Sequence, residues 1–315
     1  MKKALIVGID NYQSSPLKGC VNDANAIAKT LETNGDDSPN FSVKLITSSS
    51  TDITRSSLRE AIESLFSGKS DMALLYFSGH GFMKNTEGYL VTQDVHQYDE
   101  GVSMDCVLGI ANKSNAKNKI IILDCCHSGA LGSPSMTNNN LALLSEGLSV
   151  LTASRDNESA IEVNGSGVFT SLVVDALKGG AADLRGNITP GSLYAYVDEA
   201  LGAWDQRPIF KTNISNFASL RNVPPKVPLE TMRKITIYFN TPETEHKLNP
   251  SYEDTEDSAI KDNVEIFKNL QKFQSVGLVV PVDEEFMYYA ALNSKSCRLT
   301  ALGYQYWRLA NENKL

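Results

Sequence analysis

The first two thirds of the chain alternate between short apolar runs and longer amphipathic segments. The runs are apolar at nearly every position, which is typical of strands that are covered on both faces in a parallel sheet. Five buried strands are predicted: Ala4–Ile9, Val43–Thr47, Met72–Ser78, Lys119–Asp124 and Leu148–Ser154.

The segments between these strands repeat apolar residues at helical spacing. In one of them Leu58, Ile62 and Leu65 share a face, and either Asp52 or Thr54 could cap the first turn. Because strands and helices alternate, we expect an α/β domain with a mostly parallel sheet flanked by helices. The predicted helices are Val21–Leu31, Arg55–Phe66, Val168–Leu177 and Ser192–Leu201.

The pattern changes after residue 222. A proline-rich stretch, Val223–Pro228, reads as a linker, and Lys234–Phe239 is predicted as a strand. The segment Asn240–Asp262 carries seven acidic residues and two lysines, so we expect a mobile acidic loop there. These features divide the chain into a first domain over 1–222 and a C-terminal regulatory or sensor domain over 223–315.

Regular structure is expected to return after the acidic segment. Asn263–Phe273 has the pattern of an amphipathic helix, and Thr300 is placed to cap a final helix. The segments Gly277–Val282 and Phe286–Leu292 could each be strand or helix, and a turn follows at residues 293–296. The C-terminal domain is therefore predicted to be a small α+β domain, and its helix–turn–helix order resembles a winged-helix domain.

Composition and charge narrow the class of protein. The chain is 42 % hydrophobic and 21 % charged, as in ordinary globular proteins, and its net charge is −8. A negative chain is a poor partner for nucleic acid or for an anionic membrane. The apolar run Ala4–Ile9 is too short for a signal peptide, and no stretch is long enough to span a bilayer. We therefore expect a cytoplasmic protein that binds neither DNA nor membranes.

The cysteines predict no disulfide framework and no zinc site. There are five of them, an odd number, and the four histidines are not spaced with them as metal ligands. Cys20, Cys106 and Cys297 are expected to pack in the core. No metal or cofactor is expected. Calcium dependence is conceivable, but no segment has the spacing of a calcium loop.

Two polar motifs follow predicted strands directly. Ser78-Gly79-His80-Gly81 comes after one strand, and Asp124-Cys125-Cys126-His127-Ser128-Gly129 comes after another. Catalytic groups gather at the carboxyl edge of an open parallel sheet, so neighbouring strands would bring these motifs together. An imidazole within hydrogen-bond reach can take the proton of a thiol and make it a nucleophile. The motifs thus predict a Cys–His pair, in which the residues alone do not decide between Cys125 and Cys126.

The two motifs resemble the active-site motifs of caspase-like cysteine peptidases, in the clan of caspases and gingipains, and are most similar to those of metacaspases and bacterial orthocaspases. The motif residues His80 and Cys126 are 46 positions apart, close to the roughly fifty expected in such enzymes. Residues 8–12, 17–24, 151–160 and 167–170 also resemble segments of the family, so the resemblance covers about 1–222. It implies a caspase-like fold, Cys126 as nucleophile, His80 as its partner, and an oxyanion hole from the backbone of Gly81 and Cys126.

The resemblance also implies a substrate class. Metacaspase-like enzymes place two aspartates in the specificity pocket, and the matching positions here are Asp23 and Asp124. An acidic pocket selects Arg or Lys before the scissile bond, and Arg fits two carboxylate oxygens best. Ser154 and Asp156 could form a further wall. The structural alternatives are that Asp23 is only a charge near a helix N-terminus and that Asp124 is only a loop ligand.

The sequence after Cys126 bears on how the enzyme would be activated. The stretch from Cys126 to Ser154 contains no Lys or Arg, so a basic-specific enzyme cannot cut itself there. We expect an enzyme that stays one chain and is switched on by a small signalling ligand or protein partner at the C-terminal domain. The resemblance suggests a role in bacterial anti-phage defence or cell death. A caspase-like scaffold or adaptor without catalysis is the alternative function.

Overall fold

A computed structural model of the protein describes residues 1–84, 87–95, 101–125, 143–153, 162–163, 166–201, 208–215 and 218–315. The chain forms two compact units. The first comprises residues 1–183 and 187–223, and the second comprises residues 184–186 and 224–315. Each unit has an apolar core of its own. Among the described residues no helix is both long enough and apolar enough to cross a bilayer.

A six-stranded sheet forms the centre of the first unit. Its strands follow the order β12-β8-β7-β3-β1-β2, and all neighbouring pairs are parallel except β12 with β8. The five predicted strands are therefore confirmed, whereas β12 was missed. Their bounds are β1 Lys2–Gly8, β2 Phe41–Thr47, β3 Met72–Ser78, β7 Asn118–Asp124, β8 Leu148–Thr152 and β12 Ile209–Asn213.

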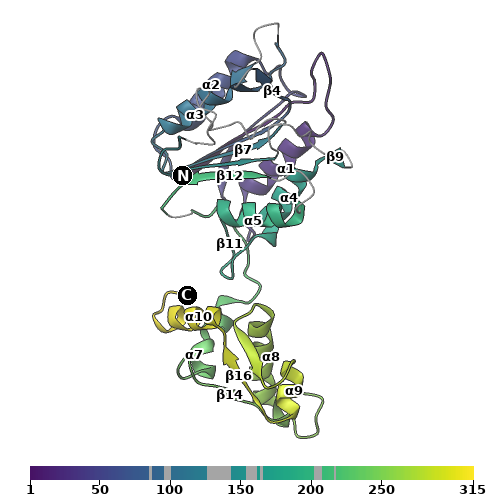
Figure 1. The fold of residues 1–315 in the computed structure, drawn as a ribbon, viewed down its shortest axis with the longest axis vertical. Helices are drawn as coiled ribbons and strands as arrows, with labels where there is room; N and C mark the ends of the chain where they lie inside the picture. The colour runs from purple at the N-terminus through teal and green to yellow at the C-terminus, as the bar shows by residue number, and fades with distance from the viewer. Residues whose placement is uncertain are drawn as a thin grey trace. The chain divides into compact units, whose positions relative to one another are not determined.

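Helices cover both faces of this sheet (Figure 1). α2 (Arg55–Phe66) and α3 (Met104–Asn112) enclose one apolar cluster, and α1 (Cys20–Glu32), α4 (Val168–Asp175) and α5 (Pro190–Leu201) enclose the other. A single π-helical stretch, Ala176–Gly180, continues α4. Two-sided coverage explains why β3 is buried at all seven positions, the feature that made it recognisable in the sequence.

The N-termini of α1 and α2 are capped in different ways. α2 begins with a capping box in which Thr54 accepts from the Ser57 amide, so Thr54 rather than Asp52 is the cap. α1 has no cap from its own N-cap residue. Instead the carboxylate of Asp10 accepts hydrogen bonds from the backbone N–H groups of Cys20 and Val21, at 2.9 and 3.3 Å. The loop after β1 therefore locks the helix that carries Asp23.

Short antiparallel pairs complete the first unit. β4 (Gly81–Lys84), β5 (Glu87–Leu90) and β6 (Val102–Ser103) form a three-stranded sheet that begins directly after His80. Two further pairs join β9 to β10 and β11 to β13. These four strands are Glu162–Val163, Ser166–Gly167, Asn187–Ile188 and Arg221–Asn222.

The prediction of a strand over Lys234–Phe239 is wrong. The segment follows α6 (Leu229–Arg233) directly and forms the short helix α7 (Ile235–Tyr238). Ile235 and Phe239 are fully buried, whereas Ile237 is 70 % exposed. The β-branched residues favour a strand by propensity, but burial at i and i+4 is the pattern of a helix face, and packing decides the outcome.

The acidic segment Asn240–Asp262 has more regular structure than its charge led us to expect. The segment contains β14 (His246–Lys247) and a 3₁₀ turn, Pro250–Tyr252, and it buries Leu248 in the core. His246 is a structural residue, as its ring bonds to the Tyr238 carbonyl and the Tyr252 hydroxyl at 2.9 and 3.2 Å. A charge count therefore misjudged a segment whose few apolar and aromatic side chains are well packed.

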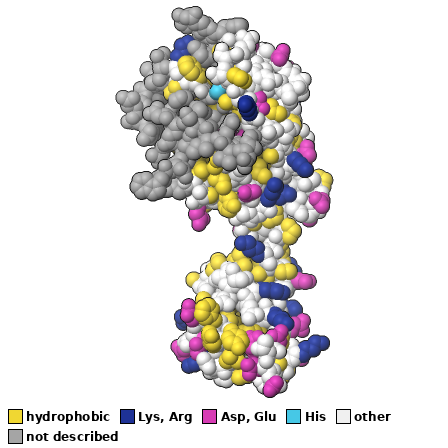
Figure 2. Space-filling model, turned by 90° about the vertical axis from the view of Figure 1, so that its right-hand side faces the viewer, with side chains coloured by type: hydrophobic (Ala, Val, Ile, Leu, Met, Phe, Trp, Pro, Cys, Tyr) yellow, Lys and Arg dark blue, Asp and Glu magenta, His cyan; other side chains and the backbone are white. Residues whose placement is uncertain are grey.

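The rest of the second unit is α+β. The helices are α8 (Lys261–Ser275), α9 (Met287–Leu292) and α10 (Ala301–Asn311), and the antiparallel sheet has the order β14-β16-β15 with β15 Val279–Val282 and β16 Ser296–Leu299. Thr300 caps α10 as predicted. β15 and β16 are joined through α9, and the winged-helix resemblance stays a prediction. Acidic and basic side chains are interspersed over the face of this unit seen in Figure 2.

Candidate active site

The two predicted catalytic motifs start in register at one edge of the sheet. β3 and β7 are parallel neighbours, and Ser78 pairs with Asp124 at their carboxyl ends. The next amide, that of Gly79, donates to the Asp124 carbonyl at 3.4 Å. His80 follows Ser78 by two residues, and Cys126 follows Asp124 by two residues. Cys126 itself lies outside the described residues, and so do the predicted pocket residues Ser154 and Asp156.

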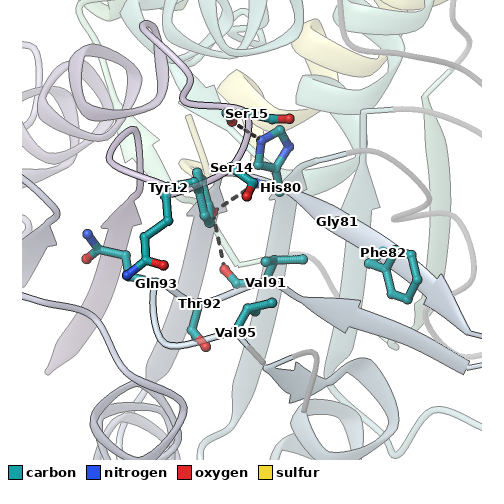
Figure 3. Close-up of a pocket in the computed structure, with 11 residues that line it drawn as sticks. Tyr12, Ser14, Ser15, His80, Gly81, Phe82, Val91, Thr92, Gln93 and Val95 are labelled. Carbon is teal, nitrogen blue, oxygen red and sulfur yellow. Dashed lines mark hydrogen bonds between the residues drawn. The ribbon is translucent and has the colours of Figure 1, made fainter. Parts of the chain in front are cut away.

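The half-buried His80 is held by the loop that follows β1 (Figure 3). Its backbone N–H donates to the hydroxyl of Tyr12 at 3.0 Å, and that hydroxyl donates to the Val91 carbonyl at 3.2 Å. The rings of Tyr12 and His80 lie 4.6 Å apart between centroids. Nε2 of His80 lies 2.6 Å from the carbonyl oxygen of Ser15. Three contacts from one loop therefore fix the position and the orientation of the imidazole.

The Ser15 contact determines the tautomer of His80. A carbonyl oxygen can only accept a hydrogen bond, so Nε2 must carry the proton. In the neutral ring Nδ1 is then the basic nitrogen, and it is the one that could accept a proton from a thiol. Ser15 has a positive φ of 62°, which is uncommon for a residue other than glycine. Such strain is often found at functional sites.

Gly79 is required by this packing. A Cβ atom at Gly79 would lie 2.5 Å from the Tyr12 hydroxyl, so any side chain would push Tyr12 away from His80. Gly81 is the first residue of β4 and pairs with Leu90 of β5. Its predicted role in an oxyanion hole with Cys126 stays a prediction.

Asp23 and Asp124 converge on Gly167 although they are far apart in the sequence. A Cβ atom placed on Gly167 would lie 2.8 Å from Oδ2 of Asp124 and 3.1 Å from Oδ2 of Asp23. The Gly167 amide donates to the Asp23 carboxylate at 3.1 and 3.3 Å, and the Thr170 hydroxyl donates to Asp124 at 2.6 Å. Both aspartates are buried, with 3 % and 6 % exposure. The start of α4 thus positions two carboxylates around one point.

The charges of Asp23 and Asp124 contribute to the raised pKa values of two neighbouring groups, Tyr76 and Cys20. The Tyr76 hydroxyl lies 2.5 Å from the Thr170 hydroxyl, which donates to Asp124, so Tyr76 is the donor to Thr170. Burial, followed by the charges of Asp124 and Asp23, raises the pKa of Tyr76 well above its ordinary value. Burial is also the main cause that raises the pKa of Cys20, with Asp10, Asp124 and Asp23 adding to it. Tyr76 and Cys20 therefore stay neutral at neutral pH.

Most of the described cysteines are too deeply buried to act as the nucleophile. Cys20, Cys125 and Cys297 are buried, whereas Cys106 is half-buried and not fully packed in the core as expected. Cys125 is 1 % exposed and packs in the apolar cluster under α2 and α3. A thiol buried among apolar side chains is inert. The burial of Cys125 therefore favours its neighbour Cys126 as the nucleophile, a choice the residues alone left open.

Four residues of this region had no role assigned from the sequence: Tyr12, Ser15, Gly167 and Thr170. Tyr12, Gly167 and Thr170 lie in motifs that resemble the family, at residues 8–12 and 167–170, so their place in the chain was a usable signal. Ser15 acts through its backbone carbonyl, which no residue type reveals. Among the described residues no group of three or more His, Cys, Asp or Glu side chains is arranged to hold a metal.

Comparison with known proteins assigns the family. A sequence model described as the caspase domain matches residues 1–218. The chain belongs to the caspase-domain family. The members of this family are cysteine peptidases, and the match covers both motifs, His80 and Cys126 included. A search of curated proteins found no match.

Two solved structures show the same caspase fold at low sequence identity. The crystal structure of a protein from Geobacter sulfurreducens is similar with a TM-score of 0.53 and 16 % identity, over 71 % of this chain and 100 % of that one. Caspase-1 from Spodoptera frugiperda is similar with a TM-score of 0.52 and 12 % identity, over 70 % of this chain and 90 % of that one. The caspase-like fold expected from the sequence is therefore confirmed.

Proposed function

We propose that this protein is a cysteine endopeptidase that cleaves peptide chains after Arg, and to a lesser extent after Lys. The observation that carries the proposal is the convergence of Asp23 and Asp124 on Gly167. Two buried carboxylates around one point attract a cation, and a planar guanidinium can bond to both at once. A substrate aspartate would be repelled by the same pair. The acidic pair supports cleavage after a basic residue and opposes the caspase preference for Asp.

The proposed chemistry uses Cys126 and His80. Nδ1 of His80 takes the proton of the Cys126 thiol, and the thiolate attacks the carbonyl carbon before the scissile bond. The protonated ring then gives a proton to the leaving amine, and a thioester remains on Cys126. Water hydrolyses the thioester and restores the thiol. The Nε2–Ser15 hydrogen bond supports this assignment because it orients the ring and fixes the tautomer in which Nδ1 accepts the proton.

Covalent labelling tests this proposal. A peptide inhibitor with Arg before an acyloxymethyl ketone should modify Cys126 once per chain, and the same inhibitor with Asp should not. Cys126→Ala should abolish the label, and His80→Ala should slow it, because the thiolate is no longer formed by a neighbouring base. Mass spectrometry of the intact chain and its peptides reads the result. Equal labelling by the Asp inhibitor would refute the acidic pocket as the source of specificity.

We also propose that the C-terminal domain, residues 223–315, controls the enzyme. The residues from Cys126 to Ser154 include no Lys or Arg, so activation by self-cleavage in that stretch is not available to a basic-specific enzyme. The second unit has its own core, as a sensor for a small signalling ligand or a protein partner would. A role in anti-phage defence or cell death would suit such an arrangement. Truncation after Asn222 should change the basal rate; an unchanged rate would argue against control by this domain.

The second candidate function is a caspase-like scaffold without catalysis. It is favoured only if no peptide is cut by wild-type protein under any condition, cell extract and nucleotides included. The ordered surroundings of His80 argue against it. His80 is held at its backbone amide, at Nε2 and on one face of its ring. A general base must be oriented in this way, whereas a scaffold without catalysis does not require it.

A further inference from the structure

A cavity of about 370 Å³ lies directly beside His80, within the roughly 300–1,000 Å³ range of ligand sites. Three segments line it: residues 12–15 after β1, residues 80–82 at the start of β4, and residues 91–93 with Val95 after β5. Figure 3 shows these side chains around the space. Of the predicted site residues that the structure describes, only His80 and Gly81 belong to its lining. The acidic pair and this cavity are therefore different features of the same sheet edge.

The order of the strands places this cavity on the β1 side of His80, whereas Cys126 follows β7 on the other side. His80 follows β3, whose neighbours are β7 on one side and β1 on the other. Cys126 follows β7, whereas Tyr12 and Ser15 follow β1. Along this edge of the sheet, the His80 imidazole therefore lies between the carboxyl end of β7, which Cys126 follows in the sequence, and the cavity.

The wall of the cavity is fixed by hydrogen bonds. The Val91 amide donates to the His80 carbonyl at 3.0 Å. The Gln93 side chain accepts from the Ile53 amide and donates to the Asn11 carbonyl, both at 2.8 Å. These bonds tie residues 91–93 to β4, to the start of α2 and to the loop after β1. The wall of the space is therefore anchored by hydrogen bonds within the protein.

The lining is uncharged and partly apolar. None of the described residues that line the cavity is Asp, Glu, Lys or Arg. Phe82 and Val95 are 46 % and 41 % exposed, and Val91 is half-buried beside them. The exposed part of the Phe82 side chain, next to a candidate catalytic histidine, is available to an apolar ligand. Burying its free surface under an apolar ligand would stabilise the complex by about 25 cal/mol for each Å² removed from water.

We propose that this cavity binds the side chain of the residue directly after the scissile bond, and that it selects an uncharged, apolar side chain there. The inference rests on the proposed peptidase function. Because His80 must give its proton to the leaving amine, the chain beyond that amine has to pass along the His80 side of the nucleophile. The cavity is the described space on that side. The substrate class is then a peptide with a basic residue followed by an apolar one.

Internally quenched peptides test this subsite. The series keeps Arg before the scissile bond and varies only the next residue among Leu, Phe, Ser, Asp and Lys. The expected kcat/KM is about tenfold or more higher for Leu and Phe than for Asp and Lys, which is the discrimination that an apolar pocket can supply. Equal rates across the series would overturn the subsite while leaving the peptidase proposal intact. Cleavage of no member would overturn both.

Two variants locate the effect in the cavity. Val95→Glu places a carboxylate in the lining and should shift the Leu-to-Lys ratio of kcat/KM at least about tenfold toward Lys. Leu45→Glu is the matched control, because Leu45 is similarly exposed at 39 % but lies on β2 and outside the lining. It should leave the ratio unchanged. A Val95→Glu ratio equal to that of wild type, or an equal shift in Leu45→Glu, would refute the assignment.

Discussion

Nε2 of His80 lies 2.6 Å from the carbonyl oxygen of Ser15. This contact makes Nδ1 the basic nitrogen of the imidazole and leaves it as the nitrogen to accept the thiol proton. The left-handed backbone of Ser15 aims the carbonyl, and the Tyr12 ring supports the imidazole from one face. Among the described residues, the geometry of the base is therefore set by a backbone carbonyl and by an uncharged ring.

Removing the Tyr12 hydroxyl should disturb this arrangement. In Tyr12→Phe the His80 amide loses its acceptor and the Val91 carbonyl loses its donor. We expect a loss of about 1–3 kcal/mol in the free energy of unfolding, because both backbone groups are left without these partners. kcat should fall about tenfold or more with little change in KM, because the base is displaced while the acidic pair proposed to bind Arg is not.

Urea unfolding and steady-state kinetics measure the two effects of Tyr12→Phe separately. Tyr194→Phe is a control in the same unit, because its ring stacks on Phe210, far along the chain from His80. It should leave kcat near the wild-type value. A Tyr12→Phe enzyme with wild-type kcat would show that the hydroxyl does not position the base.

Gly167→Ala fills the space between the two carboxylates. Gly167 has φ −65° and ψ 135°, which alanine adopts without strain, so the backbone is not the obstacle. The new Cβ would lie 2.8 Å from Asp124 and 3.1 Å from Asp23. We expect KM for Arg peptides to rise about tenfold or more, with a stability loss of about 1–3 kcal/mol from overpacking.

The matched control for that variant is Gly109→Ala in α3. A Cβ there would have no heavy atom within 4 Å. It should stabilise the fold by about 0.5–1 kcal/mol, because glycine is unfavourable inside a helix, and leave kcat and KM unchanged. If Gly167→Ala behaves like Gly109→Ala in the kinetics, the acidic pair does not contact the substrate.

Neutral replacements test the charge of the pair. Asp23→Asn and Asp124→Asn keep the shape but remove one carboxylate charge each. Loss of one partner in a buried ion pair costs about 2–5 kcal/mol, so kcat/KM for Arg peptides should fall at least about thirtyfold. Glu60→Gln, an exposed carboxylate on α2, is the control and should change nothing. Full activity in both pocket variants would leave the basic preference without a physical cause.

Thiol reactivity offers a test that needs no substrate. Burial raises the pKa of Cys297 to about 12 and also raises that of Cys20. A raised pKa lowers the thiolate fraction, so at pH 8 only about one Cys297 in ten thousand is ionised. Alkylation at pH 8, followed by peptide mass spectrometry, should label Cys126 first and Cys106 second. Cys20, Cys125 and Cys297 should react only after unfolding. Rapid labelling of Cys20 in the folded chain would contradict this order.

The parallel strands and the helices α1, α2, α4 and α5 could be predicted because both faces of the strands are covered, whereas α3 was missed. β3 is buried at every position, and that gives an uninterrupted apolar run which turn residues delimit. β12 was missed because none of its five residues is fully buried, and an edge strand need not carry a continuous apolar pattern. In the second unit the sequence pattern failed at Lys234–Phe239, where packing overrides strand propensity.

The candidate site was predictable to the extent that side chains define it. The glycines around His80 and the aspartates at 23 and 124 are visible as residue types in recognisable motifs. The Ser15 carbonyl and the Tyr12 hydroxyl are not, because their roles depend on the path of a loop that no periodicity encodes. The cavity beside His80 is assembled from three segments, so it could be found only in the folded chain.

The central claim is that Cys126 and His80 form the catalytic pair of an enzyme that cuts after Arg. The most direct measurement compares kcat/KM for two fluorogenic peptides that differ only in Arg or Asp before the scissile bond. Wild type should cut the Arg peptide at least about a hundredfold faster, and Cys126→Ala and His80→Ala should each reduce that activity to background. Cleavage of the Asp peptide at a similar rate, or Arg cleavage that survives Cys126→Ala, would contradict the claim.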